Sequence, residues 1–205
     1  MNPSPSKEVA RLDWAFASRC APGETCSGDL HLVKHFPGGA LAAVVDGLGH
    51  GAEAHCAAQA ALAVLDEHAG EAVVPLVERC HAALRTTRGV VMTLVSFDFT
   101  ARGATALGVG NVCAVLVRAD PTATPSCEYV LQRSGIVGDQ MPTLQATRFD
   151  LSDGDTLIFA TDGVREGFGE GVASSDTPQH IADRVMDCGF RGNDDALVLV
   201  VRHFL

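Results

Sequence analysis

The chain has 205 residues, of which 47% are hydrophobic, 20% charged and 5% aromatic. This composition excludes a disordered or low-complexity chain, and the length predicts one compact domain over residues 1–205, with residues 1–10 as a flexible leader. With 15 basic and 25 acidic side chains, the formal net charge is −10. That charge argues against a nucleic acid or an anionic membrane surface as a partner.

Mostly strands are predicted, from short apolar runs that are separated by turn residues. The expected elements, in chain order, are strands over residues 12–17, 30–36 and 40–45, helices over 52–68 and 73–85, strands over 90–99, 105–109, 112–117, 128–132 and 156–160, a helix over 178–188 and a closing strand over 196–202. The alanine-rich helix over 52–68 is expected to be buried on most sides. Because regular β-α-β alternation is absent, an α+β sandwich is favoured over a doubly wound parallel sheet.

Seven cysteines are scattered along the chain without a Cys-x-x-Cys pair, so neither a disulfide framework nor a zinc ribbon is expected. The N-terminus has no apolar signal-peptide core. No stretch reaches the roughly 20 apolar residues that span a bilayer. These features predict a cytoplasmic protein with reduced thiols.

Four aspartates each lie at the end of a predicted strand, next to glycine or in a loop. They are Asp29, Asp46, Asp162 and Asp194, and Asp195 directly follows the last of them. Strand ends on one rim of a sandwich can bring such side chains together. Crowded carboxylates repel one another, and a divalent cation removes that penalty. Asp-Gly is also a common turn dipeptide, so the hypothesis depends on all four aspartates acting together.

Hard cations such as Mg²⁺ and Mn²⁺ prefer oxygen ligands and often retain waters, so a few aspartates and a backbone carbonyl suffice to hold them. Two such ions about 3.5–4 Å apart would clamp a phosphate and lower the pKa of a bridging water. The acidic pattern therefore indicates a site for Mn²⁺ or Mg²⁺, with two ions expected.

Four segments, in this order, resemble the metal-dependent protein phosphatase (PPM, type 2C) superfamily in its bacterial SpoIIE-like branch. They are SGD at 27–29, VVDGLGHG at 44–51, ATDGVRE at 160–166 and NDDALVLVV at 193–201. The segments GVGNV at 108–112 and GIVG at 135–138 further resemble RsbX-like stand-alone phosphatases of stress-signalling modules. The resemblance extends over residues 27–201, nearly the whole chain.

The resemblance implies a four-layer α-β-β-α sandwich of two antiparallel sheets, with a helix pair on each outer face. It implies a protein serine/threonine phosphatase with a binuclear Mn²⁺/Mg²⁺ centre at one end. By that likeness Asp46 bridges both ions and the carbonyl of Gly47 completes one coordination sphere. Asp29, Asp162 and Asp194 hold the ions from the other sides. The implied substrates are STAS-domain proteins of a stressosome, phosphorylated by a serine kinase of the same module.

One-step hydrolysis by metal-activated water is the expected mechanism, with Asp46 as a catalytic residue and a metal-bound water or His50 as the acid for the leaving group. Eukaryotic relatives read Asp-Gly-His-Gly-Gly, but Leu48 occupies that histidine position in this chain, and His50 comes two residues later. Their phosphate-binding arginine has no clear counterpart either, since Arg19 has the wrong spacing. The cations are therefore expected to be the main phosphate anchors.

Two other functions fit the sequence less well. A pseudophosphatase could bind a phosphorylated STAS-domain protein without hydrolysing it, although the presence of all four aspartates argues against this. A metal-dependent nuclease conflicts with the net charge of −10 and the few aromatic residues. The doublet Asp194-Asp195 could use either residue as a ligand, and Asp194 is favoured because it aligns with the ligand of the family.

Overall fold

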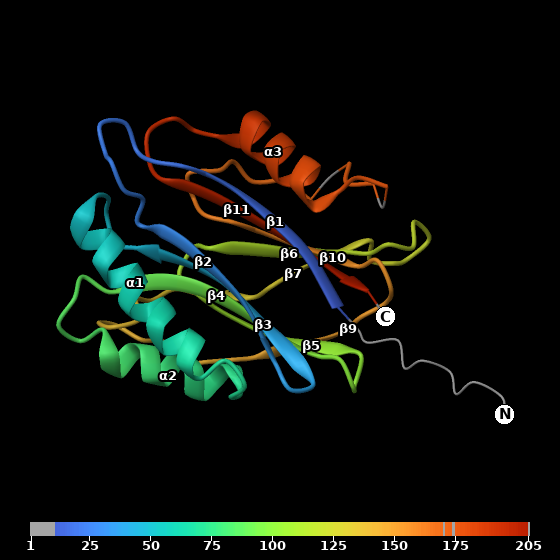
Figure 1. Ribbon diagram of the computed structural model, residues 1–205, viewed down its shortest axis with the longest axis horizontal. Coiled ribbons are helices and arrows are strands. Elements are labelled where there is room, and N and C mark those ends of the chain that lie inside the picture. Colours follow the sequence, from blue (N-terminus) through green and yellow to red (C-terminus); the bar gives the residue numbers. More distant parts are fainter. Residues whose placement is uncertain (1–10, 170, 174, 205) are drawn as a thin grey trace, which may run out of the picture.

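The computed structural model describes residues 11–169, 171–173 and 175–204. It is a four-layer sandwich in which two β-sheets pack face to face and helices cover the outer faces (Figure 1). The predicted α-β-β-α architecture is confirmed. The leader expected over residues 1–10 lies outside the described residues.

The first sheet has the strand order β1-β11-β10-β6-β7, and all its pairs are antiparallel. Its strands are β1 (Arg11–Arg19), β6 (Cys113–Val117), β7 (Cys127–Tyr129), β10 (Thr156–Ala160) and β11 (Ala196–Phe204). One helix, α3 (Pro178–Gly189), packs on the outer face against β1 and β11. The expectation of a helix pair on this face was wrong for the described residues, because α3 is joined there by loop residues such as Phe168 and Phe190 and not by a second helix.

The second sheet has the order β2-β3-β4-β5-β8, and β9 also pairs with β5. Its strands are β2 (Asp29–Phe36), β3 (Gly39–Gly47), β4 (Val90–Asp98), β5 (Gly103–Val109), β8 (Gln132–Arg133) and β9 (Thr147–Asp150). The short β8 runs parallel to β5, which departs from the antiparallel expectation. The strand predicted over residues 128–132 is divided between the two sheets, because the chain leaves β7 and crosses to β8.

Two helices, α1 (Ala52–Glu67) and α2 (Val73–Ala83), cover the outer face of the second sheet (Figure 1). The buried residues of α1 are Ala54, Ala57, Ala58, Ala61 and Leu65. They lie along one side of the helix, while Cys56 and Gln59 are exposed, so the expectation that this helix is buried on most sides was wrong. The small alanine side chains allow the helix to pack closely on the sheet.

Strands β3, β10 and β11 form the rigid centre of the sandwich. In β3, Leu41 and Val45 face the helices while Ala42 and Val44 face the other sheet, and all four are fully buried. A strand buried on both faces has a continuous apolar sequence, which is why these segments were predictable. Asp46 lies near the end of β3, and Asp162 and Asp194 lie just outside β10 and β11, so these buried strands position three of the aspartates described below.

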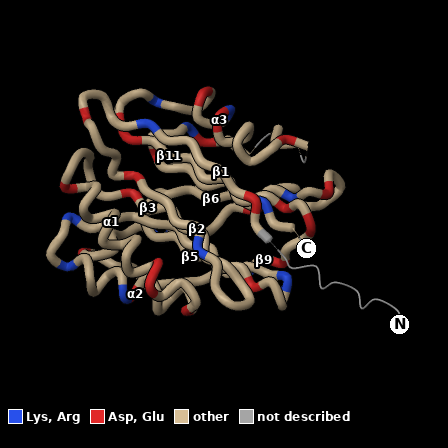
Figure 2. The backbone as a smooth tube through the Cα atoms, viewed as in Figure 1, with Lys and Arg blue, Asp and Glu red and all other residues tan. Residues whose placement is uncertain are grey.

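Acidic positions outnumber basic ones along the backbone (Figure 2), in agreement with the net charge of −10. All seven cysteines are free thiols. Within the described ranges, the chain forms no helix that is both long and apolar enough to cross a membrane.

Candidate metal centre

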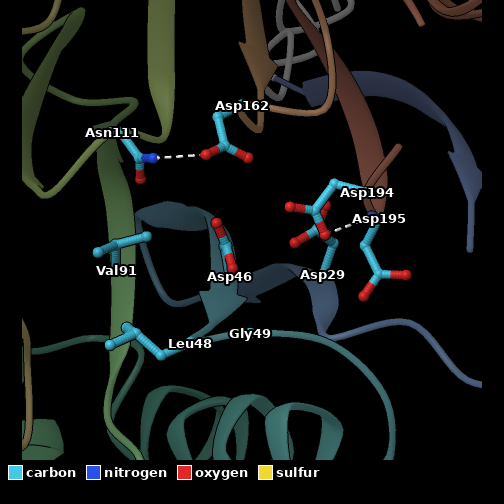
Figure 3. Close-up of a pocket in the computed structure, with 9 residues that line it drawn as sticks. All are labelled: Asp29, Asp46, Leu48, Gly49, Val91, Asn111, Asp162, Asp194 and Asp195. Atoms are coloured by element: carbon cyan, nitrogen blue, oxygen red, sulfur yellow. Dashed lines mark hydrogen bonds between the residues drawn. The ribbon is translucent and has the colours of Figure 1, made fainter. Parts of the chain in front are cut away.

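Five aspartates line a pocket of about 170 Å³ where the two sheets meet at one end of the sandwich (Figure 3). Asp29 is the first residue of β2, and Asp46 lies directly opposite it near the end of β3. Asp162 follows β10, and the pair Asp194 and Asp195 precedes β11. Residues directly opposite in an antiparallel pair have Cβ atoms about 4.5–5.5 Å apart, and like charges there are destabilising. The structure thus brings the predicted aspartates of both sheets together.

The glycines beside these aspartates are required by close packing. A Cβ on Gly47 would lie 2.1 Å from the carbonyl oxygen of Ala54 at the start of α1. A Cβ on Gly163 would lie 2.0 Å from the carbonyl oxygen of Asp195, and one on Gly28 would lie 2.9 Å from the Ala54 methyl group. None of the three has a positive φ. The Asp-Gly motifs at this end therefore bring backbone segments into contact, which a turn dipeptide alone would not require.

Burial and mutual repulsion act strongly on two of the carboxyl groups. Burial raises the pKa of Asp29 to about 7; the charges of Asp195, Asp162 and Asp194 add to this, and a hydrogen bond from Thr161 opposes it. Burial, followed by the charges of the other four aspartates, raises the pKa of Asp46 to about 9.

No basic side chain neutralises these carboxylates within the pocket. Among the described residues that line it there is no lysine, arginine or histidine. Asp29 is 3% exposed, and its Oδ2 is a buried oxygen without a hydrogen-bond partner. A buried carboxylate without a partner costs free energy, so the cluster is incomplete without a cation or protons.

The Asp194-Asp195 doublet has two different environments. Asp195 is buried, and its two carboxylate oxygens accept hydrogen bonds from the backbone N–H groups of Ala21 (2.7 Å) and Gly28 (2.8 Å). It thereby fastens the loop before β2 to the start of β11. Asp194 accepts one hydrogen bond, from the N–H of Asp195 at 2.8 Å, and its carboxylate leans toward Asp46 (Figure 3). Asp194 therefore accepts fewer backbone hydrogen bonds than Asp195, and more of its carboxylate lone pairs are available to a cation.

Asn111 is a pocket residue that the sequence analysis did not single out as a site residue. Its Nδ2 donates a hydrogen bond to Oδ2 of Asp162 at 2.8 Å, as the dashed line in Figure 3 shows. Asn111 follows β5 and Gly110, whose φ of +98° turns the chain at the pocket. A polar residue after a glycine at a strand end was the available sequence clue.

Two other predicted site residues lie outside the pocket lining. His50 is exposed, and its Nδ1 lies 2.6 Å from Oε1 of Glu24. Gly47 is buried between Asp46 and α1, and it does not line the pocket either. The acid role of His50 and the ligand role of the Gly47 carbonyl therefore stay predictions.

The donor chemistry fits Mg²⁺ or Mn²⁺, because the pocket offers carboxylate oxygens, one of them a buried oxygen without a partner. In the described part of the chain, however, no three His, Cys, Asp or Glu side chains already surround a single point as ligands. The two observations agree if the ions keep several waters, as Mg²⁺ commonly does.

Comparisons with known proteins assign the chain to a family and support its fold. The family model described as "Stage II sporulation protein E (SpoIIE)" matches residues 37–204. The phosphoserine phosphatase RsbX of Bacillus subtilis (strain 168) is 29% identical over 144 residues, which cover 69% of each chain. A solved structure described as "The bacterial stressosome: a modular system that has been adapted to control secondary messenger signaling" has 30% identity and a TM-score of 0.84, covering 94% of this chain and 100% of its own.

A structure of RsbX in complex with magnesium has 22% identity and a TM-score of 0.83, covering 94% of this chain and 95% of its own, and it supports the fold. Since the family model matches well over half of the residues, the chain belongs to the SpoIIE family.

Proposed function

We propose that this SpoIIE-family chain is a metal-dependent protein phosphatase that hydrolyses phosphoserine and phosphothreonine. The observation that carries the proposal is the meeting of Asp29, Asp46, Asp162 and Asp194 in one pocket without a basic partner among the described residues. The similarity to the phosphoserine phosphatase RsbX supports the same activity.

In the proposed site Asp46, which lies between the other carboxylates (Figure 3), would be the central ligand of the cations. Asp29, Asp162 and Asp194 would be further carboxylate ligands, and the carbonyl of Gly47 would supply a backbone oxygen. When bound, Mn²⁺ or Mg²⁺ supplies positive charge to the phosphate oxygens and makes water acidic enough to attack near neutral pH. His50 remains the predicted proton donor to the departing serine or threonine oxygen.

The other pocket residues have supporting roles in this proposal. Asn111 holds the carboxylate of Asp162 in one orientation through its hydrogen bond. Asp195 fixes the loop that leads into Asp29. Asp29 and Asp46 release their protons when cations bind, because the charge of the ions replaces the repulsion that keeps the protons on.

The substrate that we propose is a phosphorylated STAS-domain protein of a stressosome, phosphorylated by a serine kinase of the same signalling module. The similarity to RsbX and to a structure from a stressosome study supports this choice. The acidic net charge fits a protein partner better than a nucleic acid. Seven free thiols fit the cytoplasm, and we propose that residues 1–205 form a single catalytic domain.

The test is the release of phosphate from p-nitrophenyl phosphate and from a phosphorylated STAS-domain protein, with Mn²⁺, with Mg²⁺ and with EDTA. We expect cation-dependent turnover that Asp162→Asn lowers at least a hundredfold, because one ligand is lost. Asp139→Asn, a change at an exposed aspartate outside the pocket, is the matched control and leaves turnover unchanged. Full activity in Asp162→Asn would refute the ligand assignment, and binding without turnover by the wild type would indicate a pseudophosphatase.

A further inference from the structure

A second, larger hollow opens beside the aspartate pocket. It has a volume of about 430 Å³, against about 170 Å³ for the aspartate pocket, and Asn111 and Asp162 line both. Ligand pockets in proteins usually enclose roughly 300–1,000 Å³, so the aspartate pocket is small and the neighbouring hollow is of ordinary size. The small pocket suits a phosphate with its cations, and the larger hollow lies where the rest of a substrate would continue.

We propose that this hollow, which we call the Tyr129 groove, binds the residues of the phosphoprotein next to the phosphoserine and prefers a bulky apolar side chain there. The proposal rests on the proposed phosphatase function and adds a substrate preference to it. Its occupant is a polypeptide because the groove shares Asn111 and Asp162 with the pocket that would receive the phosphate.

The preference for an apolar side chain follows from what lines the groove. Tyr129 on β7 is 55% exposed, although it is one of the largest apolar side chains of the protein. Phe168 and Cys113 are half-buried, and Val164 is buried beside them. Covering an exposed aromatic ring with an apolar group of a ligand is energetically favourable.

Apart from Asp162, which also lines the aspartate pocket, the groove has one charged residue of each sign. Arg191 and Glu166 both line it and have opposite signs. The carboxylate of Asp162 lies at its boundary with the aspartate pocket, where Asn111 donates a hydrogen bond to it. Apolar surface therefore distinguishes the groove from the aspartate pocket, and an apolar neighbour of the phosphoserine is the complementary group.

The opposite edge of the same sheet provides an internal comparison. Strand β1 also exposes two aromatic side chains, Trp14 at 40% and Phe16 at 42%. Both rings contact the imidazole of His31 on β2, with the Phe16 centroid at 4.1 Å, and neither residue lines the aspartate pocket. Trp14 is therefore a matched control for Tyr129: a large exposed aromatic residue on an edge strand, away from the proposed chemistry.

The experiment compares phosphoserine peptides that carry Leu, Ala or Asp at each of the three positions on either side of the phosphoserine. With the full-length protein and Mn²⁺, we expect kcat/KM for Leu to exceed that for Ala about tenfold at one position, which corresponds to about 1.4 kcal/mol. Tyr129→Ala should reduce this ratio to about twofold or less, while Tyr129→Phe retains it because the ring is kept. Trp14→Ala should leave the ratio unchanged.

Equal kcat/KM for Leu and Ala at every position, or the same Leu preference in Tyr129→Ala, would overturn the proposal. Preference for Asp at that position would overturn it as well. If no peptide lost its phosphate, the proposed phosphatase function would fail instead. Fluorescence anisotropy of the labelled peptides in Mn²⁺ would then still decide the groove, because the Leu-to-Ala ratio of dissociation constants reports the same contact.

Discussion

An aspartate lies just outside each end of strand β10, and the two carboxylates have opposite electrostatic surroundings. Asp155, just before the strand, is 1% exposed, and Arg118 pairs with it at 2.8 Å. The backbone N–H groups of Ala119 and Ser152 also donate hydrogen bonds to it. Asp162, just after the strand, joins four other acidic side chains at a pocket whose described lining contains no cationic group.

The difference separates structural carboxylates from functional ones. A buried carboxylate that the chain itself neutralises stabilises the fold locally and needs nothing from solution. In a cluster that the chain leaves unneutralised, burial and repulsion raise the pKa values of Asp29 and Asp46, and cations from outside relieve both costs. The four predictions below test this contrast between the two ends of β10.

The largest expected effect is at the cluster, with Asp46→Asn. Loss of the carboxylate shared by the proposed ions should lower kcat about a thousandfold, since metal-assisted hydrolysis loses its central ligand. The same change should raise the melting temperature of the metal-free protein at pH 8, because Asp46, with a folded pKa of about 9, must take up a proton on folding and asparagine need not. Phosphate release and thermal unfolding in EDTA measure the two effects. A metal-free variant less stable than the wild type would contradict the repulsion that we infer.

At the other end, Asp155→Ala should destabilise the fold instead. It leaves Arg118 with Glu128 as its remaining carboxylate partner and removes the acceptor of two backbone N–H groups. We expect a loss of about 3 kcal/mol. For a chain of this length that corresponds to a fall in melting temperature of roughly 6–12 °C.

Below its melting temperature, Asp155→Ala should keep its cation-dependent turnover. Thermal unfolding and phosphate release at 20 °C measure both. If Asp155→Ala kept its stability but lost turnover, Asp155 would be a functional carboxylate and not a structural one.

The stability of the metal-free protein should also fall as pH rises. Burial and the neighbouring carboxylates raise the pKa of Asp29 to about 7 and that of Asp46 to about 9 in the folded state, above the ordinary aspartate value of 3.8. The folded state therefore binds more protons than the unfolded state between about pH 4 and 9, and stability is lost across that window as pH rises.

Thermal unfolding in EDTA from pH 5 to 8.5 should show a decline of several degrees, and saturating Mg²⁺ should remove most of it. Asp46→Asn should flatten the decline in EDTA, which isolates the contribution of this cluster from that of other titrating groups. A decline that is equally steep in Asp46→Asn would place its cause elsewhere.

The smallest of the four effects is expected for Asn111→Ala. Without the hydrogen bond to Asp162, that carboxylate loses one constraint, and partners of this kind typically change metal affinity 10–100-fold. We expect about a tenfold increase in the Mn²⁺ concentration for half-maximal turnover, with a smaller change at saturating Mn²⁺. An unchanged cation dependence would mean that the hydrogen bond is not needed.

Much of this architecture could be predicted from the sequence, because its central strands are buried on both faces. Two apolar runs, one ending at Asp46 and one over residues 156–160, predicted β3 and β10. Because Asp46 and Asp162 come at the ends of these runs, both were expected at strand ends. Strand β9 was missed because Phe149 is its one buried residue. The sequence did not predict that the chain leaves the first sheet after β7 and joins the second at β8. Residues before and after this crossing both favour strands, so they were predicted as one strand.

The finer features of the site depend on contacts between residues far apart in the chain. Asp194 and Asp195 are adjacent and chemically identical, and their environments differ because Ala21 and Gly28 donate to Asp195. Asn111 reaches Asp162 across 51 positions of sequence. Such pairings depend on how the two sheets pack, which neither periodicity nor composition contains.

A crystal grown with Mn²⁺ and measured for anomalous scattering at the manganese edge tests the metal centre most directly. We predict two peaks in the pocket, both within coordination distance of the Asp46 carboxylate, with Asp162 and Asp194 among the other ligands. Peaks confined to other surfaces, or an Asp46 carboxylate that contacts neither ion, would contradict the account.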